Sequence, residues 1–496
     1  MKRILRLVAL SALLAIVFAT SSVQAFHERR VHNVLHSKDD PSAGKLDNGK
    51  TSITKLVPPI TKVFNYSGDI WERGTMFGDP GGLRTKLYES GFTLDAQLTQ
   101  VYQGVTSGGN ASGNGSGSYN GLLEINSTLD TAKLGLWSGG LIAATFQASF
   151  GDPLESEAGN VSPVNMTPMW PKPFDNGSTY LTEYYLFQGL PHEMEFIAGR
   201  IDATNFLDKN TFANNPESQF LNASLNNMLL WGNFLTFSTY ATIFVAPVTK
   251  GLKIAVAAWT PNTEPGDDAG DWSDYGVVAN PMFDYHLGGL PGAVQVVAAY
   301  SSADTKAFDN PSFAPITLQL DPLTDIIINI PDIPGGVPSK NDNWMFTLNG
   351  EQYLWTPPGA SVPRAKGGRK EDFFVPTQDF AVNPPGVGLF YRAAYTPKDR
   401  NLWNWNVSGG LGARGIIPGR PYDRMGIGVY AMFLSDDAED DPLLDALLDD
   451  EYGVEAYYNF AITPWMQLSA NVQRISPGIK PSDDAWVLGS RLNMRF

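Results

Sequence analysis

Cysteine is absent from this chain of 496 residues, and histidine is scarce, with five in all. The lack of cysteine excludes a disulfide framework, a thiolate metal site and a cysteine nucleophile. Only His192 and His286 lie beyond residue 68, which argues against a Ser/His hydrolase of the lipase type. A glycosidase pair of carboxylates stays open, because Asp and Glu are abundant.

Positive charge is also in short supply. The chain has 35 Lys and Arg against 51 Asp and Glu, which gives a formal net charge of −16 and a pI of about 4.7. Nucleic acid is therefore not expected as a partner, because phosphates are bound by basic surfaces. Charged residues make up only 17% of the chain and aromatic residues make up 12%, a composition that argues against disorder.

Long apolar runs are missing as well. No segment after residue 25 approaches the run of ~18 apolar residues that a membrane-spanning helix needs. This excludes an inner-membrane helical bundle. It does not exclude a membrane β-barrel, whose strands are apolar on one face only.

The N-terminus has the three parts of a signal peptide. Positive charge comes first, from Lys2, Arg3 and Arg6. The apolar run 7–18 follows, and small residues mark the cleavage site that ends residues 1–25. The run is too short to cross a bilayer, which takes about 20 residues. We therefore expect the protein to be exported.

Residues 26–68 differ from the rest of the chain, because they are polar, contain proline and show no strong period. They predict a mobile periplasmic extension. His27, His32 and His36 lie here, and His32 and His36 would share one face of a helix. A metal site is the alternative. No carboxylate or cysteine follows at metal-ligand spacing, so we favour a solvated tail and expect neither metal nor cofactor.

From residue 92 apolar and polar residues alternate, as they do in β-strands with two different faces. The first such segment has an apolar face made of Phe92, Leu94, Ala96, Leu98 and Tyr102. The last segment alternates in the same way. Its apolar face is Trp486, Leu488, Leu492 and Met494, and its polar face is Arg491, Asn493 and Arg495.

Such alternation fits a soluble β-sandwich or a membrane barrel, and three features favour the barrel. The segments are about 10 residues long, as crossing strands are. Aromatic residues such as Trp465 and Trp486 gather at strand ends, and Glu124 and Arg491 lie mid-strand on the polar face. We predict an all-β fold, a transmembrane antiparallel β-barrel of about 16 strands over residues 92–496. A short helical segment at 69–91 precedes it.

Short and long connections alternate along the predicted barrel. A short one is Thr463-Pro464, and the long ones, rich in Gly, Pro, Asn and Asp, are 104–118, 151–178, 203–232, 261–273, 303–342, 357–370 and 436–451. We expect the long loops to be extracellular, with one or two of them folded inward. The chain ends on Phe496 directly after a strand, which fits the terminal signal read by the barrel-insertion machinery.

Three stretches of the chain resemble the carbohydrate-selective porins of Gram-negative outer membranes. Residues 78–91 resemble the pattern G-D-W-G-G-x-R-x-x-L-x-x-x-G, except that Pro80 stands where the family has Trp. Residues 119–140 contain the second match and residues 455–465 the third. Matches in the same order near both ends imply that the resemblance covers most of residues 70–496.

The resemblance implies an outer-membrane porin that passes monosaccharides and related small carbohydrates down their gradient, without a cofactor and without catalysis. Its partners would be small sugars and outer-membrane lipid, and it would be a monomer or a trimer. Two alternatives remain open. One is a general porin or a porin specific for another small solute. The other is a secreted β protein that binds or hydrolyses carbohydrate.

A pore that favours sugars should offer charged side chains to their hydroxyls and aromatic faces to their rings. Trp170, between prolines of a long loop, is the predicted aromatic surface, and Arg84 would reach the lumen from the helical segment. The alternative for each residue is ordinary wall or loop packing. The residues predicted to line the pore and bind substrate are Arg84, Trp170, Glu183, Arg200, Asp202, Arg392 and Arg414.

Overall fold

The computed structural model describes most of the chain after residue 65. The described residues are 66, 68–110, 115, 117–172, 177–235, 237–261, 263–267, 273–306, 339–358 and 385–496. The predicted signal peptide, and the histidines of the predicted extension, lie outside these residues.

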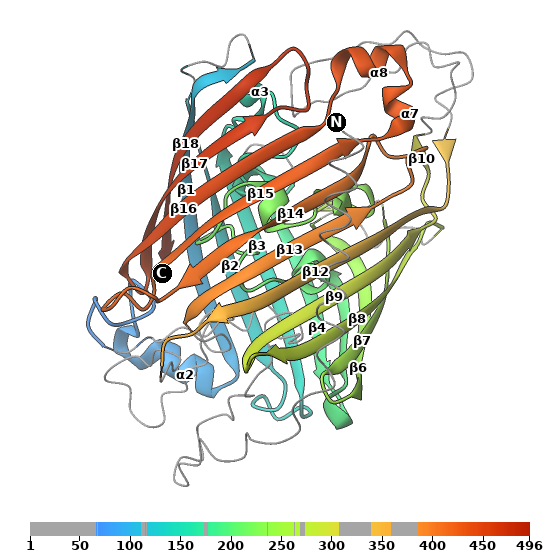
Figure 1. Ribbon diagram of the computed structural model, residues 1–496. Coiled ribbons are helices and arrows are strands. Elements are labelled where there is room, and N and C mark those ends of the chain that lie inside the picture. The colour runs from blue at the N-terminus through green and yellow to red at the C-terminus, as the bar shows by residue number, and fades with distance from the viewer. Residues whose placement is uncertain are drawn as a thin grey trace.

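The described strands form one closed antiparallel barrel of sixteen strands, in which each strand pairs with its neighbours along the chain (Figure 1). The first eight are β1 (Phe92–Gly109), β2 (Gly117–Asp130), β3 (Gly140–Gly151), β4 (Thr179–Gly189), β5 (Glu195–Ile201), β6 (Thr239–Thr249), β7 (Leu252–Trp259) and β8 (Gly276–Leu287). The others are β9 (Leu290–Ser301), β12 (Asn343–Trp355), β13 (Gly386–Tyr395), β14 (Trp403–Arg414), β15 (Arg424–Leu434), β16 (Glu451–Thr463), β17 (Met466–Ser476) and β18 (Asp483–Arg495). Two short strands, β10 (Thr305–Lys306) and β11 (Ser339–Lys340), pair apart from the barrel.

The barrel closes where the first strand meets the last. β1 pairs with β18 over a long register that includes Gln97 opposite Arg495 and Gly104 opposite Leu488. Closure leaves no free sheet edge whose backbone groups lack partners, which a barrel in a bilayer requires. The prediction of a sixteen-stranded antiparallel barrel is confirmed.

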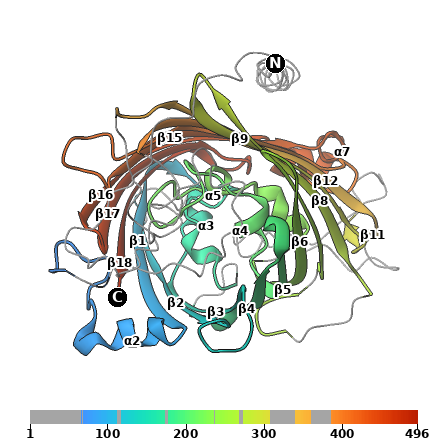
Figure 2. The ribbon, with the colours of Figure 1, turned by 90° about the horizontal axis from the view of Figure 1, so that it is seen from below.

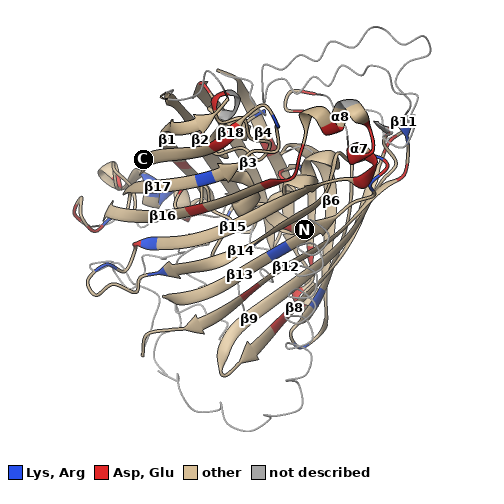
Figure 3. Ribbon diagram, turned by 45° about the horizontal axis from the view of Figure 1, so that its top comes forward, with Lys and Arg blue, Asp and Glu red and all other residues tan. Residues whose placement is uncertain are grey.

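The two faces of the strands point as the alternation predicts. On β1, Leu94 and Tyr102 are exposed on the outer face, while Asp95 and Gln97 are buried on the inner face. On β18 the exposed Trp486 alternates in the same way with inner polar residues. Figure 3 shows mostly uncharged strands with isolated charged positions, and acidic residues gathered on α7 (Asp436–Glu439) and α8 (Pro442–Leu447). An apolar outer belt around a polar inside is the pattern of a barrel in lipid.

The two-residue turns lie at one end of the barrel and the long connections lie at the other end, with one exception. Gly288 and Gly289 alone join β8 to β9, and both have positive φ values, which glycine adopts without strain. The loop expected at 357–370 follows β12. Trp355 of β12 pairs with Val387 of β13 at the end of the barrel where the short turns lie. The expectation that this connection lies with the extracellular loops is therefore wrong.

Two long connections run inside the barrel (Figure 2). The first inner segment, residues 152–172, follows β3 and contains α3 (Glu155–Ala158) and η4 (Thr167–Met169). The second inner segment, residues 202–235, follows β5 and contains α4 (Thr204–Leu207), α5 (Ala223–Asn226) and η6 (Leu229–Asn233). The expected inward folding of one or two long loops is thus present.

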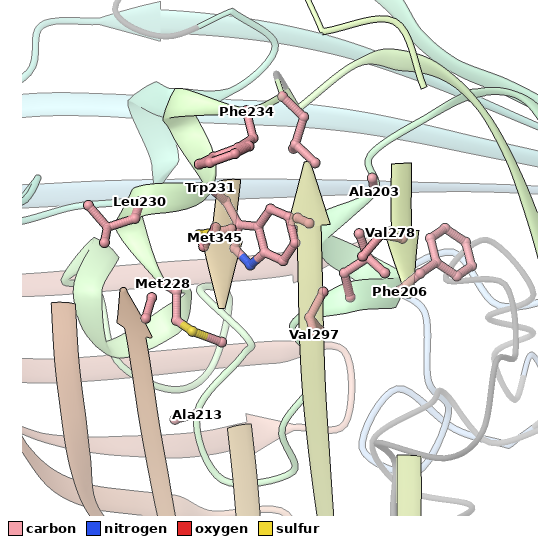
Figure 4. Packing of buried hydrophobic residues seen from close by; sticks show 14 of the residues in the cluster. Ala203, Phe206, Ala213, Met228, Leu230, Trp231, Phe234, Val278, Val297 and Met345 are labelled. Carbon is pink, nitrogen blue, oxygen red and sulfur yellow. The ribbon is translucent and has the colours of Figure 1, made fainter. Parts of the chain in front are cut away.

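The second inner segment builds an apolar core inside the lumen. Figure 4 shows Trp231 and Phe234 of this segment beside Met345 and Val297, whose side chains point inward from the wall. Burial of each such side chain contributes roughly 1.5–3 kcal/mol. The inner face of the strands β5 to β9 is therefore largely apolar, unlike the wet, polar lumen face that the alternation predicts.

The helical segment before the barrel lies at the rim rather than in the lumen. It consists of η3 (Pro80–Gly82) and α2 (Leu83–Glu89), and neither helix buries a residue. The Asp79 carboxylate accepts hydrogen bonds from the backbone N–H of Arg84 at 2.8 Å and from Thr85 Oγ1 at 2.5 Å, which fixes the start of α2. Among the helices of the described residues, none combines the length and apolar character needed to cross a bilayer.

Candidate functional site

A cavity of about 150 Å³ lies between the inner face of β1 to β4 and the two inner segments. The wall contributes Gln97, Thr99, Glu124, Gln147 and Glu183, and the inner segments contribute Trp170, Asp202, Lys209 and a series of asparagines. Most of the lining side chains are polar, unlike those on the inner face of β5 to β9. The cavity therefore presents hydrogen-bonding groups and an aromatic ring to a small solute.

Three of the predicted site residues meet on this cavity. Glu183 Oε1 accepts a hydrogen bond from the backbone N–H of Asp202 at 3.0 Å, although the two residues come from β4 and from the start of the second inner segment. Trp170 Nε1 donates to Asp202 Oδ2 at 3.4 Å across from the first inner segment. The sequence placed these residues on separate elements, and the barrel brings them together.

Neutral donors hold the Asp202 carboxylate. Its Oδ1 accepts from the Thr204 backbone N–H at 3.0 Å and from Thr204 Oγ1 at 2.6 Å. Burial raises the pKa of Asp202 to about 6, because a desolvated carboxylate favours its neutral form. The group therefore titrates close to physiological pH.

The indole of Trp170 is partly buried and packs against Phe237, with the ring centroids 5.1 Å apart. This contact and the hydrogen bond to Asp202 fix the plane of the ring at the cavity wall. An immobilised aromatic face costs little entropy to use, so a sugar ring can lie against it through its C–H groups.

Glu124 and Gln147 form the facing part of the wall, on β2 and β3. Gln147 Nε2 donates to Glu124 Oε2 at 3.0 Å, and Asn126 Nδ2 donates to Glu124 Oε1 at 2.6 Å. Glu183 accepts a further hydrogen bond from Thr145 Oγ1 at 3.0 Å. Neutral amides and hydroxyls therefore position the carboxylates of this wall.

Sequence reasoning missed the cavity residues of the second inner segment. Lys209 is buried there, its Nζ lies 5.5 Å from the Phe206 ring centroid, and burial lowers the pKa of Lys209 to about 8. Asn205, Asn210 and several other amides line the same side. The high asparagine content between residues 205 and 227 was the available signal, since few loops need so many buried amides.

Arg392 points into the lumen but is covered by the second inner segment, and its exposed fraction is 0%. Its Nε lies 2.9 Å from Asp208 Oδ1, and its other nitrogens donate to the carbonyls of Leu225, at 3.0 Å, and Ala213. The predicted contact with a solute is therefore corrected: Arg392 binds the inner segment to β13.

Arg414 and Arg200 also lie away from the cavity. Arg414 lines a separate, smaller cavity together with Arg424 and Tyr353. Arg200 of β5 pairs in register with Tyr240 of β6, and its guanidinium carbon lies 4.9 Å from the centre of the Tyr240 ring. It donates to Ser238 Oγ at 2.6 Å and to the Asp267 carbonyl at 2.8 Å, so it ties the β7–β8 loop to the wall.

Arg84 does not line the cavity, but from α2 it reaches Asp95 on the inner face of β1. Its Nη1 lies 3.3 Å from Asp95 Oδ1, its Nη2 donates to the Phe496 backbone carbonyl at 2.9 Å, and its guanidinium covers the Tyr66 ring at 4.8 Å. These contacts connect the helical segment to both the first and the last strand. That Arg84 contacts a solute stays a prediction.

Other inward charges hold the inner segments in place. Glu451 Oε1 accepts from the backbone N–H of Ser162 at 2.9 Å, and Glu455 Oε1 accepts from the backbone N–H of Leu221 at 2.8 Å. A carboxylate that accepts backbone N–H groups replaces the water that these groups lose on burial. Within the described part of the chain, no group of three or more His, Asp or Glu side chains is arranged to hold a metal ion.

Comparisons with known proteins agree with this architecture. The structure entitled "High pH structure of Pseudomonas putida OprB" superposes with a TM-score of 0.69 at 20% identity, covering 86% of this chain and 100% of that one. A stretch of 128 residues is 27% identical to Porin B of Pseudomonas aeruginosa, covering 22% of this chain and 28% of that protein. The chain thus matches less than a third of the length of this relative.

The family model of the carbohydrate-selective porins, OprB family, matches residues 114–496. The match covers most of the barrel and confirms the resemblance read from the sequence. The family and the closed barrel point to a channel rather than to an enzyme, and to the Gram-negative outer membrane. The chain belongs to the OprB family of carbohydrate-selective porins.

Proposed function

We propose that this protein passes monosaccharides and related small carbohydrates through the outer membrane by diffusion down their gradient. The observation that carries the proposal is the cavity, in which carboxylates, amides and the fixed ring of Trp170 surround one small polar space. The proposal calls for no cofactor and no energy source.

The chemistry of the cavity suits a neutral, hydroxyl-rich solute. Sugar hydroxyls donate to carboxylate and amide oxygens and accept from amide N–H groups, and Glu183 and Asn205 supply groups of both kinds. The C–H face of the sugar ring packs on Trp170. Each contact replaces a contact with water, so the net binding is weak, and weak binding is what allows the solute to leave on the other side.

Single-channel recording in planar bilayers tests the proposal. The purified protein should give discrete steps of ion current, and glucose at millimolar concentration should reduce the current by occupying the cavity. Steps that glucose leaves unchanged would instead indicate a general porin or one for another solute. A folded protein that gives no steps would contradict the channel itself.

Trp170→Ala identifies the part of the cavity that the sugar uses. We expect the constant for glucose block to weaken about threefold to tenfold, because an aromatic contact contributes roughly 0.5–1.5 kcal/mol. Trp486→Ala is the matched control, since Trp486 is exposed on the outer face and should leave glucose block unchanged. Equal block in wild type and in Trp170→Ala would remove this ring from the path.

A further inference from the structure

Beyond neutral sugars, we propose that the cavity selects small sugars that carry a protonated amine, and that it disfavours sugars that carry a carboxylate. This inference rests on the proposed function, because it names the class of sugar that the same cavity binds best. Three steps carry it: the charge of the wall, an acceptor without a donor, and the fit of an ammonium group between them.

Three carboxylates of the cavity have only neutral partners. Glu124, Glu183 and Asp202 accept hydrogen bonds from amides, hydroxyls, an indole and backbone N–H groups. In the described part of the chain, none of the three takes part in an ion pair. Carboxylates without a neighbouring cation retain most of their attraction for a cationic solute, and the partly desolvated cavity strengthens it.

Gln147 adds an acceptor that no group among the described residues satisfies. Its side chain is 6% exposed and borders the cavity, and its Oε1 has no hydrogen-bond partner. The orientation of the amide follows from Glu124, which as a carboxylate only accepts, so the Gln147 nitrogen must face it and the oxygen must point elsewhere. A buried carbonyl oxygen of this kind costs free energy unless a ligand or a water donates to it.

The other charges of the cavity do not cancel this preference. Lys209 is the cation on the cavity wall, and it also faces Glu195, which attracts it. Glu217 lies 4.0 Å from Arg495, so each offsets the other. Glu183 and Asp202 lie side by side, and two neighbouring buried carboxylates do not both ionise fully. Glu124 and one charge of this pair therefore remain against Lys209, and the balance of the wall is negative.

A protonated amine matches these groups in number and in kind. An ammonium has three donors and no acceptor, so each of its N–H groups can donate to a carboxylate or amide oxygen of this wall. The ring of Trp170 adds a face that attracts cations. A sugar carboxylate would instead meet a wall with an excess of negative charge, and the repulsion raises the barrier to its passage.

The experiment compares four solutes on the same channel at pH 6.5: glucose, glucosamine, N-acetylglucosamine and glucuronate. Glucosamine is cationic at this pH, because its amine has the pKa range of an α-amino group. We expect glucosamine to block the current about tenfold more tightly than glucose, N-acetylglucosamine to resemble glucose, and glucuronate to block least. N-acetylglucosamine is the control for size, since it keeps the nitrogen but loses the charge.

Two neutral variants test whether the named carboxylates are responsible. Glu124→Gln and Asp202→Asn should each reduce the ratio of glucosamine block to glucose block about threefold to tenfold. Asp484→Asn is the matched control, because Asp484 pairs with Arg474 at the exposed rim and not in the cavity. Two variants on different elements guard against the failure of either one to fold.

The pH dependence gives an independent readout through Asp202. Its carboxylate faces Glu183 on β4, Glu124 on β2, and Lys209 and Glu217 on its own segment, while nearby Arg200 is engaged by Ser238 and Asp267. Burial raises the pKa of Asp202 to about 6, so its negative charge appears as the pH rises from 5 to 7. The permeability ratio of K⁺ to Cl⁻ should rise over this range, and less so in Asp202→Asn.

The outcomes separate the inference from the function beneath it. Equal block by glucose, glucosamine and glucuronate would overturn the amine preference and leave the sugar channel intact. Tighter block by glucuronate than by glucosamine would also overturn the amine preference. It would indicate that Lys209, and not the carboxylates, determines which charged sugar binds. Current steps that none of the four solutes affects would overturn the proposed function and the amine preference together.

Discussion

Two parts of the lumen wall differ in what covers them. The inner face of β1 to β4 borders the cavity with Gln97, Glu124 and Glu183. The inner face from β5 onward lies largely under the second inner segment, against which Val297 and Met345 pack. The inner face is therefore polar along β1 to β4 and largely apolar where the second inner segment covers it.

The difference shows that a charged side chain that points into the barrel does not necessarily line the path of a solute. Arg392 and Glu455 face the lumen, as the alternation predicts, but their partners are Asp208 and backbone groups of the inner segments. Glu183 faces the same lumen and reaches the cavity. Which role a residue takes depends on where the second inner segment lies.

The largest effect should come from Arg392→Ala, which removes the ion pair between the covered wall and the inner segment. It leaves Asp208 buried without its cation and two backbone carbonyls without a donor, at a cost of about 3–5 kcal/mol. We expect the inner segment to detach part of the time, which single-channel recording would detect as larger and noisier current steps.

Arg474→Ala is the control for this change, because the Arg474–Asp484 pair is exposed at the rim. Quiet steps of normal size in Arg392→Ala would mean that the apolar packing alone holds the inner segment. The covered part of the wall would then differ from the open part through the apolar contacts of Trp231 and its neighbours, and not through charge.

A smaller effect should follow from Phe220→Ala, which weakens the apolar side of the same contact. The Phe220 ring packs on Phe390 at 5.4 Å and on Tyr457 at 4.8 Å, and it is fully buried. Removing it should lower the free energy of unfolding by about 3 kcal/mol, seen as a lower temperature for loss of the folded band in heat-modifiability gels. Phe460→Ala, on the exposed outer face, should leave that temperature in detergent nearly unchanged.

The smallest effect on the current is expected for Arg84→Ala, because Arg84 does not line the cavity. The ion pair joins largely buried side chains, so its loss lowers the free energy of unfolding, but neither residue lines the cavity. Glucose block and ion selectivity should equal those of the wild type. A changed block would show that the rim contacts of α2 reach the cavity and would return Arg84 to the list of pore residues.

Much of the fold followed from local patterns. Alternation of ten or so residues, tight turns and terminal Phe496 predicted a closed barrel, because a strand's side chains point to opposite faces by geometry alone. The sites were predicted less well. Trp170, Glu183 and Asp202 reach the cavity, while Arg84, Arg200, Arg392 and Arg414 do not. Whether any of them binds a sugar remains a prediction.

The sequence by itself determined the strands, their two faces and the family, since these depend on residues close together in the chain. Only the tertiary structure decided which inward residues meet a solute. Leu221 and Glu455 are far apart in the sequence, and so are Asp208 and Arg392, yet these contacts fix the path of the inner segment. A long loop satisfies its buried backbone groups wherever the barrel offers partners, and no periodicity in the loop itself encodes that choice.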